Sequence, residues 1–104
     1  MAHLVHDLKC WPQYFDAMLE GRKPFELRRD DRGYTEGNVL HVREWDPRVD
    51  KYTGRELWRE ITYVARPSHM PSVWGSPLAE NFVILGLRGY EPRVSADRTR
   101  AVER

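Results

Sequence analysis

The chain has 104 residues, of which 40% are hydrophobic and 32% are charged, and its formal net charge is +1. This length suits one domain, and a charge so close to neutral excludes a protein that coats nucleic acid through bulk electrostatics, so any nucleic-acid site must be local. One cysteine excludes an intramolecular disulfide and a cysteine-based zinc site. The lack of a long apolar run excludes a membrane helix, and we expect a soluble cytoplasmic protein without metal or cofactor.

The first predicted elements are a short strand and a helix. Alternating apolar residues predict a strand over Val5–Leu8. Pro12 suits the first turn of a helix and Gly21 suits the position after its end, so we expect the main helix over Pro12–Glu20. Apolar side chains at steps of three and four residues predict one packed stripe along it. They are Trp11, Tyr14, Phe15, Met18 and Leu19. Trp11 either belongs to the core or forms a stacking surface at the mouth of a site.

Residues 21–28 have the sequence GRKPFELR, in which charged side chains surround two apolar ones. In a strand over Phe25–Leu27 the apolar side chains share one face, and Glu26 shares the other with Arg28. Lys23 precedes a proline, which favours extended backbone and directs its ammonium toward the same mouth. The alternative is a solvated strand face with one surface ion pair, which contributes about 0–1 kcal/mol.

The rest of the chain predicts more strands. Alternation favours strands over Val39–Val42 and Leu57–Ala65, and a nearly continuous apolar run predicts a central strand over Phe82–Leu87. Between the first two, Asp46-Pro47 and Tyr52–Arg55 bracket a predicted hairpin-like excursion, with Leu57–Ala65 as its return strand. Apolar residues on both faces of Leu57–Ala65 suit a small barrel that is closed or nearly closed. We therefore expect an α+β, mainly β, barrel of about five to six strands, with the main helix after the first strand.

Two further segments are not predicted to be regular sheet. Residues 66–79 contain three prolines and cannot continue a strand, so we expect a flap beside the ligand mouth in which Val73–Trp74 is a short strand. Residues 91–104 are polar and rich in arginine, which predicts a frayed tail. The predicted domain is therefore residues 1–90.

The spacing Gly-x-Lys-x-x-Glu-x-Arg over residues 21–28 resembles the signature of the ASCH domain family, a branch of the PUA-like superfamily of small β-barrels. Further segments, in the same order, are similar to a short bacterial and phage branch of that family. They are His6-x-Leu8-Lys9-x-Trp11, Gly37–Leu40, Arg43–Pro47, Tyr52–Arg55, Ile61–Tyr63 and Phe82–Leu85. The resemblance covers residues 3–90 and implies a PUA-like barrel with its ligand cleft at the signature.

The residue types favour a site for RNA or a modified nucleoside. Phosphates attract Lys and Arg, whereas an unstacked base gains about 1–3 kcal/mol from a flat aromatic ring. We expect Glu26 to accept hydrogen bonds from amino groups on a base edge. The predicted binding residues are Lys9, Trp11, Lys23, Glu26, Arg28, Arg43 and Trp45. Tyr34 and Trp74 are further aromatic candidates unless they belong to the core.

Two enzyme alternatives stay open beside this binding module. In related N(4)-acetylcytidine amidohydrolases, a Lys, a Thr and a distant Glu form the catalytic set. The resemblance places Lys23 at the Lys position and Glu26 at the Thr position, with Glu60 or Glu80 as the distant Glu. The nucleophilic hydroxyl is then missing, although a Lys–Glu pair could still perform general acid–base hydrolysis. The other alternative is a ribonuclease, with a hard cation held by clustered carboxylates. Those carboxylates are Asp30, Asp31 and Glu26.

Overall fold

A computed structural model describes residues 4–69 and 77–92. The elements are β1 (Val5–Cys10), α1 (Pro12–Leu19), β2 (Phe25–Arg29), β3 (Val39–Asp46), β4 (Lys51–Ala65), a short 3-10 helix (Pro67–His69) and β5 (Phe82–Gly89). The fold is mainly β with its main helix after the first strand, which confirms the predicted class. The predicted strand Val73–Trp74 and most of the predicted tail lie outside the described residues.

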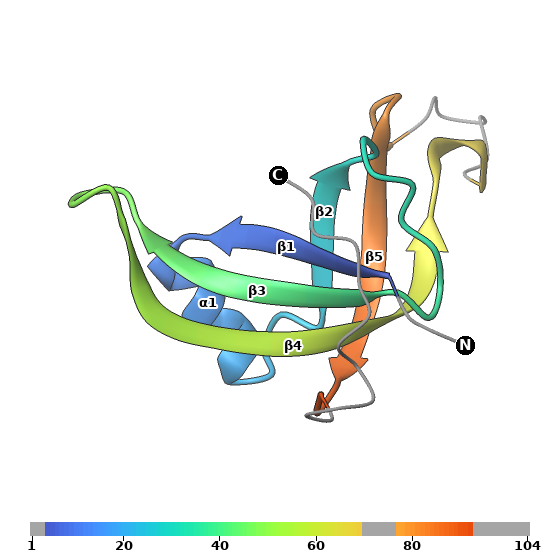
Figure 1. Ribbon diagram of the computed structural model, residues 1–104. Coiled ribbons are helices and arrows are strands. Elements are labelled where there is room, and N and C mark those ends of the chain that lie inside the picture. Colours follow the sequence, from blue (N-terminus) through green and yellow to red (C-terminus); the bar gives the residue numbers. More distant parts are fainter. Residues whose placement is uncertain (1–3, 70–76, 93–104) are drawn as a thin grey trace.

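The five strands form one sheet in the order β1-β3-β4-β5-β2. β1 and β3 are parallel, and the other neighbours are antiparallel. Figure 1 shows β1, β3 and β4 running across β2 and β5, so the sheet curls into a half-barrel. No helix among the described residues is long and apolar enough to cross a membrane.

The long strand β4 bends the sheet. Its first part pairs with β3 and its last part pairs with β5, so it belongs to both halves of the curl. The register with β5 shifts between Ile61 and Tyr63, and such bulges increase local twist. A Cβ atom at Gly86 would lie 3.2 Å from Thr62 Oγ1, so a residue without a side chain suits this bend.

The predicted hairpin between β3 and β4 is present, but its return strand begins at Lys51 and not at Leu57, so Tyr52–Arg55 already belongs to β4. Gly54 lies in this early part of β4, and its φ of 97° is in the left-handed region. The strand continues through it, opposite a register shift between Arg43 and Trp45. The glycine therefore accommodates an irregularity within the paired strands, and does not end them.

The hydrophobic core lies inside the curl. Phe15 and Met18 of α1 pack there with apolar side chains of β1, β3, β4 and β5, whereas no residue of β2 joins this cluster among the described residues. Tyr34 is also in the core, edge-on to the ring of His6 at 4.9 Å, and burial raises its pKa. Of the two alternatives for Tyr34, the core position is confirmed and the stacking surface is excluded.

The half-barrel has an open seam between its edge strands, β1 and β2. Arginine side chains bridge this seam where a further strand would pair. Arg28 Nη2 donates to the carbonyl oxygen of Lys9 at 2.8 Å, and Arg32 Nη1 donates to that of Asp7 at 2.7 Å. These bonds satisfy edge carbonyls of β1, and the seam stays accessible where β1 ends and α1 begins.

Candidate functional site

A cleft of about 570 Å³ lies at this seam, between the end of β1, the start of α1 and strand β2. Its lining residues are Lys9, Cys10, Trp11, Tyr14, Lys23, Phe25, Glu26, Leu27 and Arg28. The cleft brings together Lys9, Trp11 and the three charged residues of the signature. Arg43 and Trp45, the other predicted binding residues, are not part of its described lining.

Strand β2 buries its charged face and exposes its apolar one. Phe25 and Leu27 are 44% and 53% exposed, whereas Glu26 between them is 8% exposed. A buried carboxylate and exposed apolar side chains both cost free energy unless other groups compensate. Hydrogen bonds from Lys23 and Arg28 compensate the burial of Glu26. The exposed side chains of Phe25 and Leu27 line the cleft.

Glu26 is held by two cations, and we call Lys23, Glu26 and Arg28 the cleft cluster. Glu26 Oε1 accepts from Lys23 Nζ at 2.8 Å, and Oε2 accepts from Arg28 Nε at 2.7 Å. Lys23 Nζ also donates to the carbonyl oxygen of Phe25 at 3.1 Å. All three charged side chains are less than one-third exposed, so water and salt screen them less than a surface pair. Two cations on one carboxylate leave the cluster with a net positive charge.

Half-exposed rings from α1 face the same cleft. The carbonyl of Trp11 accepts from the amides of Tyr14 and Phe15 and so starts the helix, while the Trp11 side chain is 49% exposed. Tyr14, one helical turn later, is equally exposed. The exposure excludes the interpretation of Trp11 as a core residue, and it leaves both rings available to a ligand.

Beyond the cleft, cations and aromatic rings alternate along the end of the β3–β4 hairpin. The ammonium of Lys9 lies 4.0 Å from the centre of the Trp45 ring, and Trp45 packs edge-on against Tyr52. The guanidinium of Arg43 lies 3.8 Å from the centre of the Tyr52 ring. The carbonyl of Lys9 thus accepts from Arg28 at the seam, and its ammonium lies over Trp45, next to the cleft.

Cys10 is a buried residue of the cleft lining and not a nucleophile at neutral pH. Burial raises the pKa of its thiol to about 11, and the nearby charge of Glu26 adds to this effect. Thiols react as thiolates, so such a group is inert under ordinary conditions.

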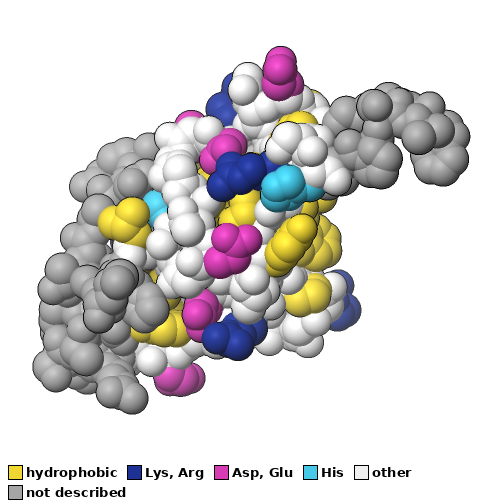
Figure 2. Space-filling view, turned by 90° about the vertical axis from the view of Figure 1, so that its right-hand side faces the viewer, with side chains coloured by type: hydrophobic (Ala, Val, Ile, Leu, Met, Phe, Trp, Pro, Cys, Tyr) yellow, Lys and Arg dark blue, Asp and Glu magenta, His cyan; other side chains and the backbone are white. Residues whose placement is uncertain are grey.

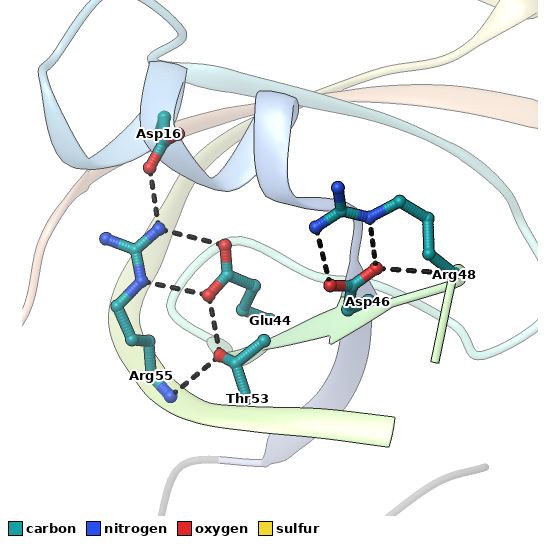
Figure 3. Close-up of polar contacts among 6 residues, drawn as sticks. All are labelled: Asp16, Glu44, Asp46, Arg48, Thr53 and Arg55. Atoms are coloured by element: carbon teal, nitrogen blue, oxygen red, sulfur yellow. Dashed lines mark hydrogen bonds and ion pairs between the residues drawn. The ribbon is translucent and has the colours of Figure 1, made fainter. Parts of the chain in front are cut away.

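A second buried carboxylate, Glu44, has a different set of partners (Figure 3). Arg55 donates to both of its oxygens, at 2.9 and 2.8 Å, and Thr53 Oγ1 donates at 2.6 Å. Arg55 Nη2 also donates to Asp16 of α1 at 2.6 Å. These hydrogen bonds, above all those from Arg55, lower the pKa of Glu44. We call these four residues the arm cluster, because they fix the hairpin end to the helix.

The carboxylates of the metal-dependent alternative do not gather. Asp30 accepts from Arg66 at 2.6 Å, Asp31 lies 3.9 Å from Arg32, and Glu26 belongs to the cleft cluster. Within residues 4–69 and 77–92, no group of three or more His, Cys, Asp and Glu side chains could hold a metal ion. That version of the ribonuclease therefore has no site in the described part of the chain.

The candidates for a distant catalytic Glu also lie elsewhere. Glu60 accepts from Arg88 at 3.0 Å, and Glu80 lines a separate hollow with Asp30 and Arg66. Figure 2 shows acidic, basic and hydrophobic side chains interspersed over the coloured part of one face. This face offers no broad cationic surface among its described residues, which agrees with a local site.

Sequence analysis missed Tyr14, Phe25 and Leu27 as lining residues. Alternation in β2 predicted that the last two share a face, but it did not predict that this face is the exposed one. Tyr14 lies three residues after Trp11 on the helix, and this spacing was a signal that the two rings share one side. Glu44 was also missed, although it continues the inward face of Leu40 and Val42.

Comparison with known proteins gives a family and a phage relative. Residues 5–87 match the family model described as Domain of unknown function (DUF3850). The chain is 42% identical over 60 residues to the "Uncharacterized 12.9 kDa protein in GpA 3'region" of Escherichia phage P2. This match covers 58% of the chain and 53% of the phage protein, so the chain spans about half the length of this curated relative.

Proposed function

The chain belongs to the family described as Domain of unknown function (DUF3850), and we propose that its cleft binds RNA or a modified nucleoside. The observation that carries this proposal is the inverted strand β2. It exposes Phe25 and Leu27 beside the half-exposed rings of Trp11 and Tyr14, and buries the charges of the cleft cluster next to them. Aromatic and other apolar side chains can pack against a base, and the neighbouring cations can bind its phosphate.

The size of the cleft agrees with such a ligand. Sites for small molecules commonly occupy about 300–1,000 Å³, and are mostly apolar with a few convergent polar groups. This cleft, of about 570 Å³, falls within that range. A base held against one ring gains about 1–3 kcal/mol, and every base can gain it because every base has a flat face.

The resemblance to the ASCH family supports the same proposal. Its signature supplies Lys23, Glu26 and Arg28, which meet at the cleft, and that family belongs to the PUA-like superfamily of RNA-binding and nucleotide-derivative-binding modules. A PUA-like assignment and a cytoplasmic location are part of this proposal.

Binding is favoured over amide hydrolysis by the contacts of Lys23. An ammonium that donates to Glu26 and to the carbonyl of Phe25 has no lone pair for attack on an amide. The position that matches the family's nucleophilic Thr holds Glu26, which has no hydroxyl. Neither Glu60 nor Glu80 lines the cleft.

Fluorescence anisotropy with labelled single-stranded RNA tests the proposal. Trp11→Ala removes a half-exposed ring of the cleft, and we expect it to weaken binding about tenfold, as for the loss of one stacked base. Tyr63→Ala is the matched control, because this ring is equally exposed but lies outside the cleft lining. Equal affinities of the two variants would contradict the proposal.

The same protein incubated with N(4)-acetylcytidine and with labelled RNA separates a binder from an enzyme. A binder releases no acetate and leaves the RNA intact. Acetate release that is lost in Lys23→Ala would instead establish the amidohydrolase.

A further inference from the structure

The cleft cluster leaves hydrogen-bond donors unused. Arginine has five N–H groups and lysine has three. Arg28 uses one toward Glu26 and one toward the carbonyl of Lys9, and Lys23 uses one toward Glu26 and one toward the carbonyl of Phe25. Within the described residues, the remaining donors of both side chains have no partner, although both side chains line the cleft.

The two acceptor atoms of the cluster, the carboxylate oxygens of Glu26, already have partners. Each oxygen of Glu26 already accepts a charge-assisted hydrogen bond, at 2.7 and 2.8 Å, and the side chain is only 11% exposed. A carboxylate that contacts a base edge needs an accessible acceptor. The cluster can thus offer hydrogen-bond donors to a ligand, and Glu26 orients the side chains that carry them, Lys23 and Arg28.

We propose that the cleft cluster is an anion subsite, in which Glu26 positions Lys23 and Arg28 around one phosphate group of the ligand. This rests on the proposed function and narrows it: the ligand is a nucleotide or an RNA phosphodiester, and a free nucleoside is a poor substitute. Glu26 is a positioning residue and does not touch the ligand.

Two hydrogen bonds hold the partly buried guanidinium of Arg28 before any ligand arrives. Its Nε atom is bonded to Glu26, its Nη2 atom is bonded to the carbonyl of Lys9, and its side chain is 28% exposed. A planar guanidinium that is already oriented matches the oxygens of a phosphate and loses little rotamer freedom on binding. Lys23 adds a second charge from the other side of Glu26. The cluster stays net positive, which suits an anion.

The apolar side chains of the cleft then take the attached base. Trp11 and Tyr14 come from α1, whereas Phe25 and Leu27 come from the exposed face of β2. Because Phe25 and Leu27 alternate with Glu26 and Arg28 along one strand, apolar and charged contacts are adjacent. A nucleotide has the same adjacency of a flat ring and a phosphate.

Isothermal titration calorimetry with the four ribonucleosides and their 5′-monophosphates tests the subsite. We expect each monophosphate to bind about tenfold more tightly than its nucleoside, and this advantage to fall with added NaCl. In Lys23→Gln and Arg28→Gln the advantage should shrink to about twofold, because the loss of affinity falls mainly on the monophosphate. A purely structural role would weaken both ligands equally.

Glu26→Gln tests whether Glu26 orients Lys23 and Arg28 or only reduces the positive charge of the cleft cluster. Removing a negative charge would by itself strengthen the binding of an anion, so a larger monophosphate advantage would overturn the positioning role. We expect a smaller advantage, because Lys23 and Arg28 lose the acceptors that orient them. Glu60→Gln is the matched control, since Glu60 also accepts from an arginine but lies outside the cleft lining.

Inorganic phosphate, followed through the Arg28 Nε–H signal in NMR spectra, keeps the two proposals distinct. A phosphate-dependent shift without any binding of RNA or nucleosides would support the subsite and contradict the proposed function. Equal affinities for nucleoside and monophosphate would support the proposed function and overturn the subsite. No shift with phosphate, together with no monophosphate advantage, would also overturn the subsite.

Discussion

The cleft cluster and the arm cluster both surround a buried glutamate, yet they are built for different roles. In the arm cluster, Arg55 donates to Glu44 and to Asp16, so carboxylates outnumber the cation (Figure 3). In the cleft cluster, one carboxylate, Glu26, serves two cations. The arm cluster, with two carboxylates and one cation, therefore has a net negative charge, whereas the cleft cluster, with two cations and one carboxylate, has a net positive charge.

Burial of a charged group therefore does not by itself indicate function. The arm cluster links α1 to the β3–β4 hairpin, and Arg55 also lies 4.7 Å from the centre of the Phe15 ring in the core. The cleft cluster lines a cavity and retains unpaired N–H groups. The two clusters differ in net charge and in position, because only the cleft cluster is net positive and lines a cavity.

The largest expected effect is on stability, from Glu44→Ala. The substitution removes a buried carboxylate that accepts three hydrogen bonds from the exposed side chains of Thr53 and Arg55, which costs about 2 kcal/mol. Urea unfolding followed by circular dichroism measures the change. Glu60→Ala is the control and should cost much less, because its partner Arg88 is mostly exposed. A similar loss in both variants would remove the distinction drawn for the arm cluster.

Lys23→Ala should affect binding more than folding. We expect affinity for single-stranded RNA to fall about tenfold, with the slope of log K against log salt reduced by about 0.7. The fold should persist, because Arg28 still pairs with Glu26. Lys51→Ala removes an exposed cation outside the cleft and serves as the control. An unchanged salt slope in Lys23→Ala would contradict the assignment of Lys23 to a phosphate.

The pH dependence of stability should also distinguish the arm cluster. The pKa of Glu44 is lowered from its ordinary value of 4.5 by Arg55, so its stabilising contribution is present above that value. It is lost as the pH falls through the lower pKa of the folded protein. The stability difference between wild type and Glu44→Gln should therefore be largest near about pH 6 and shrink toward about pH 3. A constant difference would contradict this.

The reactivity of the Cys10 thiol should give a smaller effect that depends on both clusters. Burial raises the pKa of its thiol to about 11, and the charges of Glu26 and, more weakly, Glu44 add to this shift. Glu26→Gln should thus increase the rate of the thiol with a disulfide reagent at alkaline pH, and Glu44→Gln should increase it less. The reverse order would place Cys10 closer to the charge of the arm cluster.

The smallest effect should come from Arg48→Ala. Arg48 pairs with Asp46 beside the arm cluster, but its side chain is 84% exposed (Figure 3). Exposed ion pairs contribute little because water and salt screen them. We expect the melting temperature to stay within the error of a thermal scan. A clear decrease would show that hairpin-end contacts outside the arm cluster also hold the arm.

Much of the fold could be predicted from the sequence, because local patterns determine it. Pro12 and Gly21 bracket α1, and alternating apolar residues located most of the strands. The start of β4 was predicted too late, since a paired strand can continue through a left-handed residue such as Gly54. The burial of Tyr34 also followed from tertiary packing that no local pattern contains.

The candidate site could be predicted only in part. The spacing within residues 21–28 placed Glu26 and Arg28 on one face, and the structure brings Lys23 to them. The exposure of Phe25 and Leu27 could not be predicted, because it depends on which face of β2 turns toward the core. Arg43 and Trp45 lie on strand β3 in the same row as Lys9, but the curl of the sheet keeps them out of the cleft lining.

The most direct test of the comparison is NMR spectroscopy of the ¹⁵N-labelled protein during titration with a single-stranded RNA oligonucleotide. The arginine Nε–H signals of Arg28 and Arg55 report on the two clusters, and the indole N–H of Trp11 reports on the cleft rings. We predict that Arg28 and Trp11 shift with RNA concentration while Arg55 does not. Shifts at Arg55 with no change at Arg28 and Trp11 would contradict the account.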